Sequence, residues 1–344
     1  MKNKIGFVFG AGVSFEYGYP LGNQLKNSII ESIRSKMVNV HSRDMYLASG
    51  PLKARARTLF AEINYNQSEI DEFCNKLDKF EGDSIDRFLE SHTEYTDIGK
   101  IFISLILLYC ESLNKKLYDY NKTKVYKYLM SKLFPTEASL LKIPMYYFIS
   151  FNYDISFEAY FCHYLKYHFN LSEDIVRKCY ELLKIYHVYG SLMKFDYGIT
   201  FTQRNTDEIG FRQYGTIDKE IVHKCAESIK VVPEDRAADD ESLIEIQNIV
   251  QNELSHLFCL GFGYDYTNLK RIGVLDISRR DIKDYTPRIC GSTLNITNTV
   301  AEIKFKKFNN SNFVDKELLK NFNSNHTSLE FLDNNREFIN LFPW

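Results

Sequence analysis

Four short segments rich in glycine and polar residues each follow an apolar run of this chain. The first, Gly10–Ser14 (GAGVS), follows the run Ile5–Phe9 and precedes a stretch of helical periodicity. Glycines there let a backbone approach a pyrophosphate, and a helix start offers N–H donors and a positive dipole end. A packing turn is the alternative. Hydride transfer is poorly supported, because Phe15 replaces the third glycine of the dehydrogenase fingerprint and no acidic residue ends a second strand about 20 residues later.

Three further segments add side chains that can act on a bound molecule. In 150–154 (SFNYD), Asn152 and Asp154 can present an amide and a carboxylate to one pocket, with an Asx turn or helix N-cap as the alternative. In 187–191 (HVYGS), His187 is suited to be a general base, with a structural histidine as the alternative. The turn 261–265 (GFGYD) can hold a ribose or a second phosphate, or be a plain turn.

The elements that must position these segments are predicted to be strands separated by helices. Apolar runs predict strands at 5–9, 145–149, 185–189 and 257–260, and further ones at 229–232, 289–296 and 300–305. Helical patterns cover 21–37, 98–118, 157–169 and 241–255, and Ser84 is suited to cap a helix at 85–92. This order predicts an α/β fold, a Rossmann-like doubly wound parallel sheet, with ligands beyond the carboxyl ends of its strands.

The chain is expected to contain three regions. A Rossmann domain is predicted from 1–38 and 141–305, and a helical insertion from 39–140. The insertion could be a lid, an oligomerisation surface or a docking site. A C-terminal tail, 306–344, is rich in asparagine and is expected to be weakly packed or to face a partner.

Composition narrows the class of protein. The 344 residues are 44% hydrophobic and 26% charged, with a net charge of −2, so direct nucleic-acid binding is not expected. The longest apolar run, 101–110, is shorter than the roughly 20 residues that span a bilayer, so no membrane segment is expected. The seven cysteines form no C-x-x-C pair. They predict free thiols in a reducing cytoplasm and no metal site.

In this order, the four segments resemble the SIR2-like (sirtuin) superfamily. The shared pattern is G-A-G-x-S, then [ST]-x-N-x-D, then a histidine shortly before G-S, then a late strand followed by G-x-G. Residues 10–25, with Gly18-Tyr19-Pro20, are similar to the bacterial branch in particular. The resemblance covers about residues 1–30 and 145–265, and it implies a Rossmann-like NAD site.

The resemblance also implies a role for each candidate residue. Asn152 would orient the attacking water, Asp154 would contact the nicotinamide amide, and His187 would be the general base at the ribose hydroxyls. The remaining positions expected to contact NAD are Gly10, Ala11, Gly12, Ser14, Pro20, Gly190, Ser191, Gly261, Phe262, Gly263 and Asp265. The family places its catalytic histidine immediately before the glycine, where this chain has Tyr189, so the choice between His187 and Tyr189 as the base stays open.

The activity implied by the resemblance is hydrolysis of NAD+ to nicotinamide and ADP-ribose. Sirtuin deacylases carry a four-cysteine zinc module that this chain does not supply. The alternatives are a non-catalytic subunit that binds NAD or ADP-ribose, and a zinc-free protein deacylase or ADP-ribosyltransferase. Bacterial members of this branch are often toxic effectors of antiphage defence that deplete NAD, so we expect control by oligomerisation or a second protein. Family analogues suggest a HerA-type ATPase, an Argonaute-like protein or a nucleotide-sensing subunit as in the Kongming system.

Overall fold

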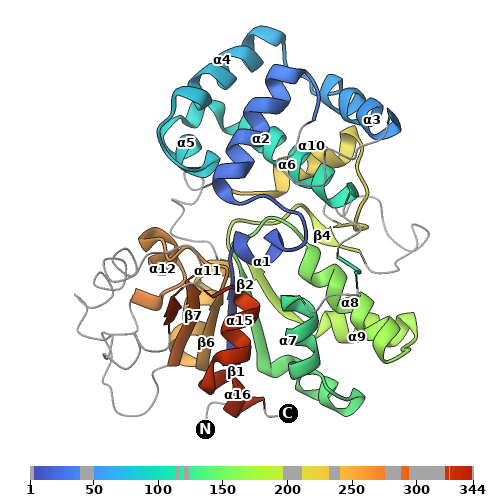
Figure 1. Ribbon diagram of the computed structural model, residues 1–344, viewed down its shortest axis with the longest axis vertical. Coiled ribbons are helices and arrows are strands. Elements are labelled where there is room, and N and C mark those ends of the chain that lie inside the picture. Colours follow the sequence, from blue (N-terminus) through green and yellow to red (C-terminus); the bar gives the residue numbers. More distant parts are fainter. Residues whose placement is uncertain are drawn as a thin grey trace.

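The computed structural model describes residues 4–38, 50–113, 117–119, 124–196, 211–231, 241–275, 288–293, 322–324 and 326–342. A parallel sheet with helices on both faces lies below a separate group of helices in Figure 1. The predicted α/β fold with a Rossmann-like parallel sheet is therefore confirmed.

The sheet has six strands, and every neighbouring pair is parallel. The strands are β1 (Lys4–Phe9), β2 (Tyr146–Ser150), β3 (Lys184–His187), β6 (Leu254–Leu260), β7 (Arg288–Thr293) and β8 (Phe322–Ser324). Their order across the sheet is β3-β2-β1-β6-β7-β8, so the direction of winding reverses between β1 and β6. Such a switch point is where open parallel sheets bind ligands. Two short strands, β4 (Lys194–Phe195) and β5 (Phe211–Arg212), pair separately.

The register brings the predicted segments to one edge of the sheet. Phe9 at the end of β1 pairs with Ser150 on one side and Leu260 on the other, and Ser150 pairs with His187. The first residues after β1, β2 and β6 therefore leave the sheet at the same level.

The core explains why the central strands are continuous apolar runs. Strand β1 has neighbours on both sides and helices on both faces, so its residues are buried whichever way they point. Phe7 stacks on Phe148 at 5.4 Å and on Phe258 at 5.6 Å, measured between ring centroids, which joins three strands through one row of aromatic rings.

The helices cover the sheet and form the upper group (Figure 1). Those before β2 are α1 (Ala11–Phe15), α2 (Gly22–Ser35), α3 (Gly50–Ala61), α4 (Gln67–Lys79), α5 (Ile85–Ser91), η2 (Thr93–Tyr95), α6 (Thr96–Leu113), α7 (Val125–Leu133) and η3 (Glu137–Met145). Those after β2 are α8 (Ser156–His168), α9 (Glu173–Glu181), α10 (Lys219–Ser228), α11 (Glu241–Asn252), α12 (Tyr266–Arg271), α15 (Ser328–Asn334) and α16 (Arg336–Leu341).

We call α2 to α6 together with α10 the helical subdomain. Helix α6, which contains the apolar run 101–110, is buried along most of its length, and α10 packs against it. Helix α2 packs against α4 and α6. Helix α7, by contrast, packs against α8 and α15 beside the sheet. Among the described residues, no helix is long and apolar enough to cross a membrane.

The structure differs from two sequence predictions and leaves a third outside its range. Residues 229–231 form no strand, and Ile229 makes only a single bridge to Gly190. The C-terminal segment is not weakly packed where it is described, because α15 packs on β7 and α7 and Phe338 of α16 contacts Phe258 at 5.4 Å between ring centroids. The strand predicted at 300–305 lies outside the described residues.

Candidate functional site

The two glycine-rich turns at the switch point pack backbone against backbone. Gly10 donates its N–H to the Leu260 carbonyl and Gly12 donates its N–H to the Gly261 carbonyl, both at 3.0 Å. A Cβ atom on Gly10 would lie 2.4 Å from the Gly261 oxygen, and one on Gly12 would lie 2.8 Å from the Gly261 Cα. These glycines therefore allow the two turns to touch. Their amides are bonded to protein carbonyls, which differs from the expected pyrophosphate cradle.

Gly261 is the position where this packing can be tested. Its φ of +56° lies in the left-handed region, and a Cβ there would lie 2.3 Å from the Val13 nitrogen. We expect Gly261→Ala to lower the free energy of unfolding by at least about 2 kcal/mol, because it adds backbone strain and a backbone clash. Urea unfolding measures this. Gly263→Ala is the matched control, since a Cβ on Gly263 meets nothing within 4 Å. Equal stabilities of the two variants would contradict the packing argument.

Asn152 connects the turn after β2 to the turn after β1. Its side-chain Nδ2 donates to the Gly10 carbonyl and to the Ser14 hydroxyl, each at 3.1 Å. Its backbone N–H donates to the Ser150 hydroxyl at 3.1 Å. Both amide protons thus have protein acceptors, and within the described part of the chain the side-chain oxygen receives no hydrogen bond. Asn152 therefore holds one fixed acceptor at the switch point.

Asp154 is buried and lies two residues before the start of helix α8. Its carboxylate accepts hydrogen bonds from the Ser156 backbone N–H, at 3.2 Å, and from the Ser156 hydroxyl. Burial raises the pKa of Asp154 above its ordinary value, while hydrogen bonds from Ser156 and Ser14 oppose that rise. This geometry is the Asx turn that the residue pattern left open. It gives Asp154 an internal structural role and provides no support for contact with a nicotinamide amide.

His187 binds protein groups through both ring nitrogens. Nδ1 lies 2.8 Å from the Asn152 carbonyl oxygen and Nε2 lies 2.8 Å from Oε1 of Glu158. The Asn152 carbonyl accepts, so Nδ1 carries a proton, and Nε2 faces the carboxyl group of Glu158. Burial lowers the pKa of His187, but the charge and hydrogen bond of Glu158 outweigh it, and the pKa is raised. Both ring nitrogens of His187 are thus engaged by protein groups, one of them the backbone of Asn152, and the general-base role stays a prediction.

Glu158 is a residue of this site that the sequence reading missed. It lies on α8, and its side chain is only 4% exposed, against 11% for that of His187. The sequence does contain a signal for Glu158: it is a single acid between Phe157 and Ala159 on an apolar helix. An acid at such a position is expected to be buried, and a buried carboxylate needs a partner.

The Glu158–His187 pair predicts a pH dependence of stability. Because the folded-state pKa of His187 is raised, its stabilisation is complete below the unfolded value and is lost as the pH rises through the folded value. We expect the free energy of unfolding to fall as the pH rises above about 6.5, the ordinary pKa of histidine, and to fall less in Glu158→Gln, whose neutral amide cannot hold the imidazolium. Urea unfolding at several pH values checks this. Subtracting the variant's curve removes the contributions of other titrating groups, and identical slopes would exclude the charged pair.

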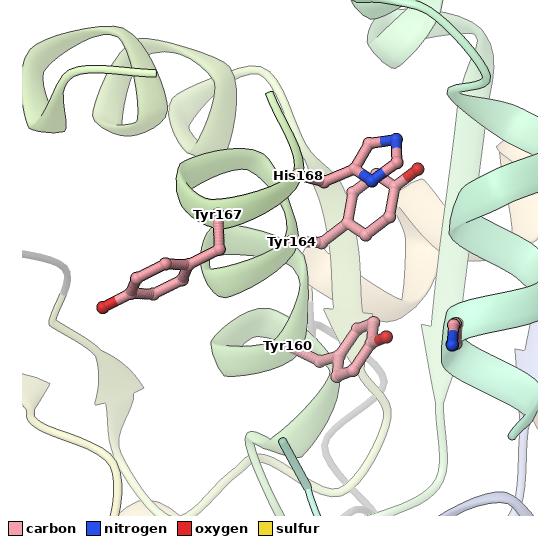
Figure 2. A pocket seen from close by; sticks show the side chains of 5 residues that line it. Tyr160, Tyr164, Tyr167 and His168 are labelled. Atoms are coloured by element: carbon pink, nitrogen blue, oxygen red, sulfur yellow. The ribbon is translucent and has the colours of Figure 1, made fainter. Parts of the chain in front are cut away.

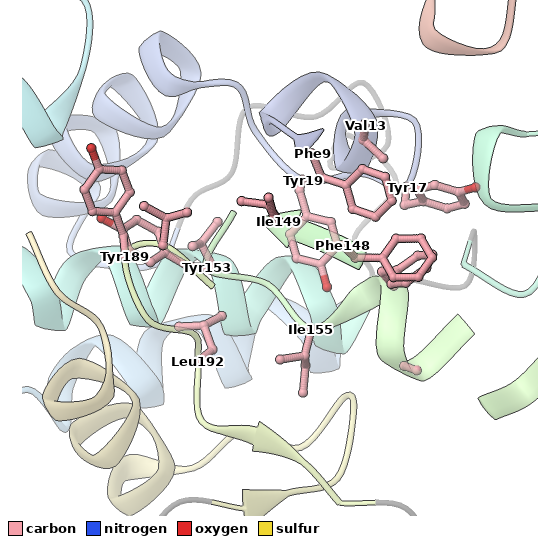
Figure 3. Close-up of a cluster of buried hydrophobic side chains, with 14 of the residues drawn as sticks. Phe9, Val13, Tyr17, Tyr19, Phe148, Ile149, Tyr153, Ile155, Tyr189 and Leu192 are labelled. Carbon is pink, nitrogen blue, oxygen red and sulfur yellow. The ribbon is translucent and has the colours of Figure 1, made fainter. Parts of the chain in front are cut away.

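Tyr189, the other residue predicted as a possible base, lies immediately before Gly190. Its hydroxyl donates to Oδ1 of Asn268 at 2.6 Å, and the Arg271 guanidinium carbon lies 4.6 Å from the ring centroid. Burial raises the pKa of Tyr189 to about 12, although Arg271 acts to lower it. The hydroxyl of Tyr189 is thus engaged by Asn268, and its role as an alternative base stays a prediction. Its ring packs on Phe151, with 5.9 Å between the centroids, and belongs to the cluster of buried side chains drawn in Figure 3.

The structure brings only some of the remaining candidates together. Phe262 packs on Phe151 with 4.9 Å between ring centroids, next to the two touching turns that contain Gly10, Ala11, Gly12, Ser14 and Gly261. The others serve their own turns. Gly190 has a φ of +68° and faces the Ser228 carbonyl, and Ser191 donates to the Met193 carbonyl at 2.8 Å. Pro20 lies between α1 and α2. Asp265 caps α12 by accepting a hydrogen bond from the Thr267 N–H at 2.9 Å.

Helix α5 brings Asp86 and Arg87 to the carboxyl edge of the sheet. The sequence predicted only the cap of this helix, Ser84. Ser84 caps it as expected, by accepting from the Arg87 N–H at 3.3 Å. Beyond the cap, Asp86 accepts a hydrogen bond from the Tyr153 hydroxyl at 2.7 Å, and Arg87 pairs with Asp265 at 3.1 Å. The helical subdomain is thus connected to the turns after both β2 and β6.

A separate cavity of about 280 Å³ is formed by helices α7 and α8. Its lining residues are Lys127, Tyr160, Tyr164, Tyr167 and His168. Figure 2 shows the rings of Tyr160, Tyr164 and His168 on one side of α8, whereas Tyr167 points the other way. Because α8 starts at the carboxyl edge and His168 is its last residue, this cavity lies away from the switch point. None of the predicted site residues lines it.

We compared the chain with protein-family models and with curated proteins. No protein-family model matches the chain, and a search of curated proteins gives no match. Within the residues that the structure describes, no group of three or more His, Cys, Asp or Glu side chains is arranged to hold a metal ion.

Proposed function

We propose that this chain hydrolyses the bond between nicotinamide and ribose in NAD+. The observation that carries the proposal is the fixed amide of Asn152 at the switch point of the sheet. Two hydrogen bonds from Nδ2 to the first glycine turn hold this amide in place, and its side-chain oxygen remains able to accept a hydrogen bond. A single fixed acceptor beside a nucleotide site suits the positioning of one water molecule.

The reaction needs little from the protein beyond position and charge. The C1′–N bond breaks with its electron pair going to neutral nicotinamide, and the ribose develops oxocarbenium character as in glycoside hydrolysis. The Asn152 oxygen accepts a hydrogen bond from the water whose oxygen attacks C1′, and that water then releases its proton to solvent. Such a cation reacts with water without a strong base, which fits a site where His187 and Tyr189 are both engaged elsewhere.

The proposed physiological role follows from the resemblance of the four segments. We place the reaction in bacterial antiphage defence, where NAD depletion stops an infected cell. Such an enzyme requires control, and we assign that control to oligomerisation or a second protein of the defence system, in the cytoplasm.

The experiment that tests the reaction follows the products. The purified chain is incubated with NAD+, with and without the product of the neighbouring gene, and nicotinamide and ADP-ribose are measured by chromatography. Equal amounts of both products support the proposal. NAD+ bound without turnover in either condition would instead establish a binding subunit, and nicotinamide release that requires an acylated or acceptor protein would establish a transferase or deacylase.

A further inference from the structure

The first turn of helix α5 bridges the two segments that flank the switch point. Asp86 bonds to Tyr153, which directly follows Asn152 in the chain. The next residue, Arg87, pairs with Asp265, which follows the second glycine turn. An acidic side chain of the helical subdomain is therefore held next to the residues that we assign to the reaction.

The carboxyl group of Asp86 is bonded by two donors of the protein. Burial raises the pKa of this carboxyl group, and the Tyr153 hydroxyl and the residue's own backbone N–H are the donors that oppose the rise. A carboxylate offers about four acceptor positions. In the described part of the chain these two donors fill only half of them. Taking a carboxylate out of water is costly unless further donors satisfy it, and the hydroxyls of a bound molecule would do so.

A Rossmann-type dinucleotide site normally binds the hydroxyls of the adenosine ribose with an acidic residue after its second strand, so a carboxylate at this edge of the sheet is a known partner of ribose hydroxyls. Here β2 ends at Ser150, and the next acid, Asp154, is engaged by Ser156 and Ser14. The usual position therefore supplies no available carboxylate, whereas Asp86 reaches the same edge from the helical subdomain.

We infer that Asp86 binds the hydroxyls of the ribose next to Asn152, so that the helical subdomain completes the nucleotide site. The inference rests on the proposed function, because it requires a nucleotide at the switch point. The carboxylate accepts hydrogen bonds from the sugar diol while it keeps the bond from Tyr153. Its negative charge also lies near the positive charge that develops on that ribose. The site is incomplete without α5.

The test measures binding separately from turnover. Titration calorimetry compares ADP-ribose with its analogue that lacks the 2-hydroxyl of the terminal ribose, on the full-length wild type, Asp86→Asn and Tyr153→Phe. We expect the wild type to bind ADP-ribose about 10-fold or more tightly than the analogue, because a hydrogen bond to a charged group is lost. Asp86→Asn should bind ADP-ribose more weakly and no longer distinguish the two. Tyr153→Phe, which keeps the carboxylate, should still distinguish them.

The remaining outcomes distinguish a failure of ribose binding by Asp86 from a failure of the proposed NAD+ hydrolysis. If Asp86→Asn still prefers ADP-ribose as strongly as the wild type does, or if it loses affinity while the preference is unchanged, Asp86 has only a structural role. If the wild type binds neither compound, the nucleotide site fails and the inference fails with it. Discrimination through Asp86 without NAD+ turnover would support the inference and overturn the hydrolysis. Thermal unfolding of each variant establishes that it is folded.

Discussion

Replacing Asn152 with alanine should lower the rate of nicotinamide release from NAD+ by about 10² to 10³, the usual cost of removing one positioning group from a site. The side-chain oxygen that would hold the water disappears with the amide. The substitution also removes the donor to the Gly10 carbonyl and the Ser14 hydroxyl, so a stability loss of about 1 to 2 kcal/mol should accompany it. Initial rates at saturating NAD+ give the catalytic effect.

Ser14→Ala is the matched control for this substitution. It removes one of the two acceptors of the Asn152 amide but leaves the oxygen of Asn152 in place. We expect a loss of less than about 10-fold in rate, because the bond to the Gly10 carbonyl remains. ADP-ribose binding should be kept in both variants. Unchanged turnover in Asn152→Ala would overturn the assigned role, and equal losses in the two variants would show that Asn152 acts only by holding the turn.

The largest expected effect on stability comes from the buried pair of Glu111 and Arg212. The side chains are 0% and 2% exposed, and the guanidinium binds both carboxylate oxygens, with Nη2 at 2.7 Å from Oε2. Arg212 also donates from Nε to the Leu192 carbonyl at 2.7 Å, and Glu111 accepts from the Gly215 N–H at 2.6 Å. This network links α6 of the helical subdomain to the segment around β5.

Removing one partner leaves the other charge buried without compensation. We expect Arg212→Met to lower the free energy of unfolding by about 3 to 5 kcal/mol. The double variant Glu111→Leu with Arg212→Met should be less destabilised than the sum of the two single changes, because it buries no lone charge. Urea unfolding of the wild type, both single variants and the double variant measures the coupling. Additive losses, or a single-variant loss below about 1 kcal/mol, would mean that the pair contributes little.

The central strands of the sheet could be predicted because buried strands consist of consecutive apolar residues, a pattern visible in the local sequence. The runs at 5–9 and 145–149 are apolar throughout, since a central parallel strand is covered on both faces. The cap at Ser84 could be predicted for the same local reason. Because parallel strands end at one edge, the sequence also predicted that the segments after β1 and β2 would meet, and the register places them there.

The rest of the site depends on contacts between distant residues. His187 looks like a base in the sequence, and only the fold reveals Glu158 at its other nitrogen. The segments that contain Gly10 and Gly261 look like two ligand-binding turns, whereas a Cβ on Gly10 would meet the backbone of Gly261, and a Cβ on Gly261 would meet the backbone of Gly12 and Val13. Asp86 gives no local signal, because its neighbour Tyr153 lies 67 residues away in the chain.

The packing of α10 against α6 has a consequence for how the chain is made. Ribosomes add about 5 to 20 residues per second, and roughly 100 residues separate the end of α6 from the start of α10. For several seconds α6 therefore stands without the helix that covers one of its apolar faces, while β2 and β3 are still being synthesised. The helical subdomain can therefore close only after α10 has been synthesised, although most of it emerges early.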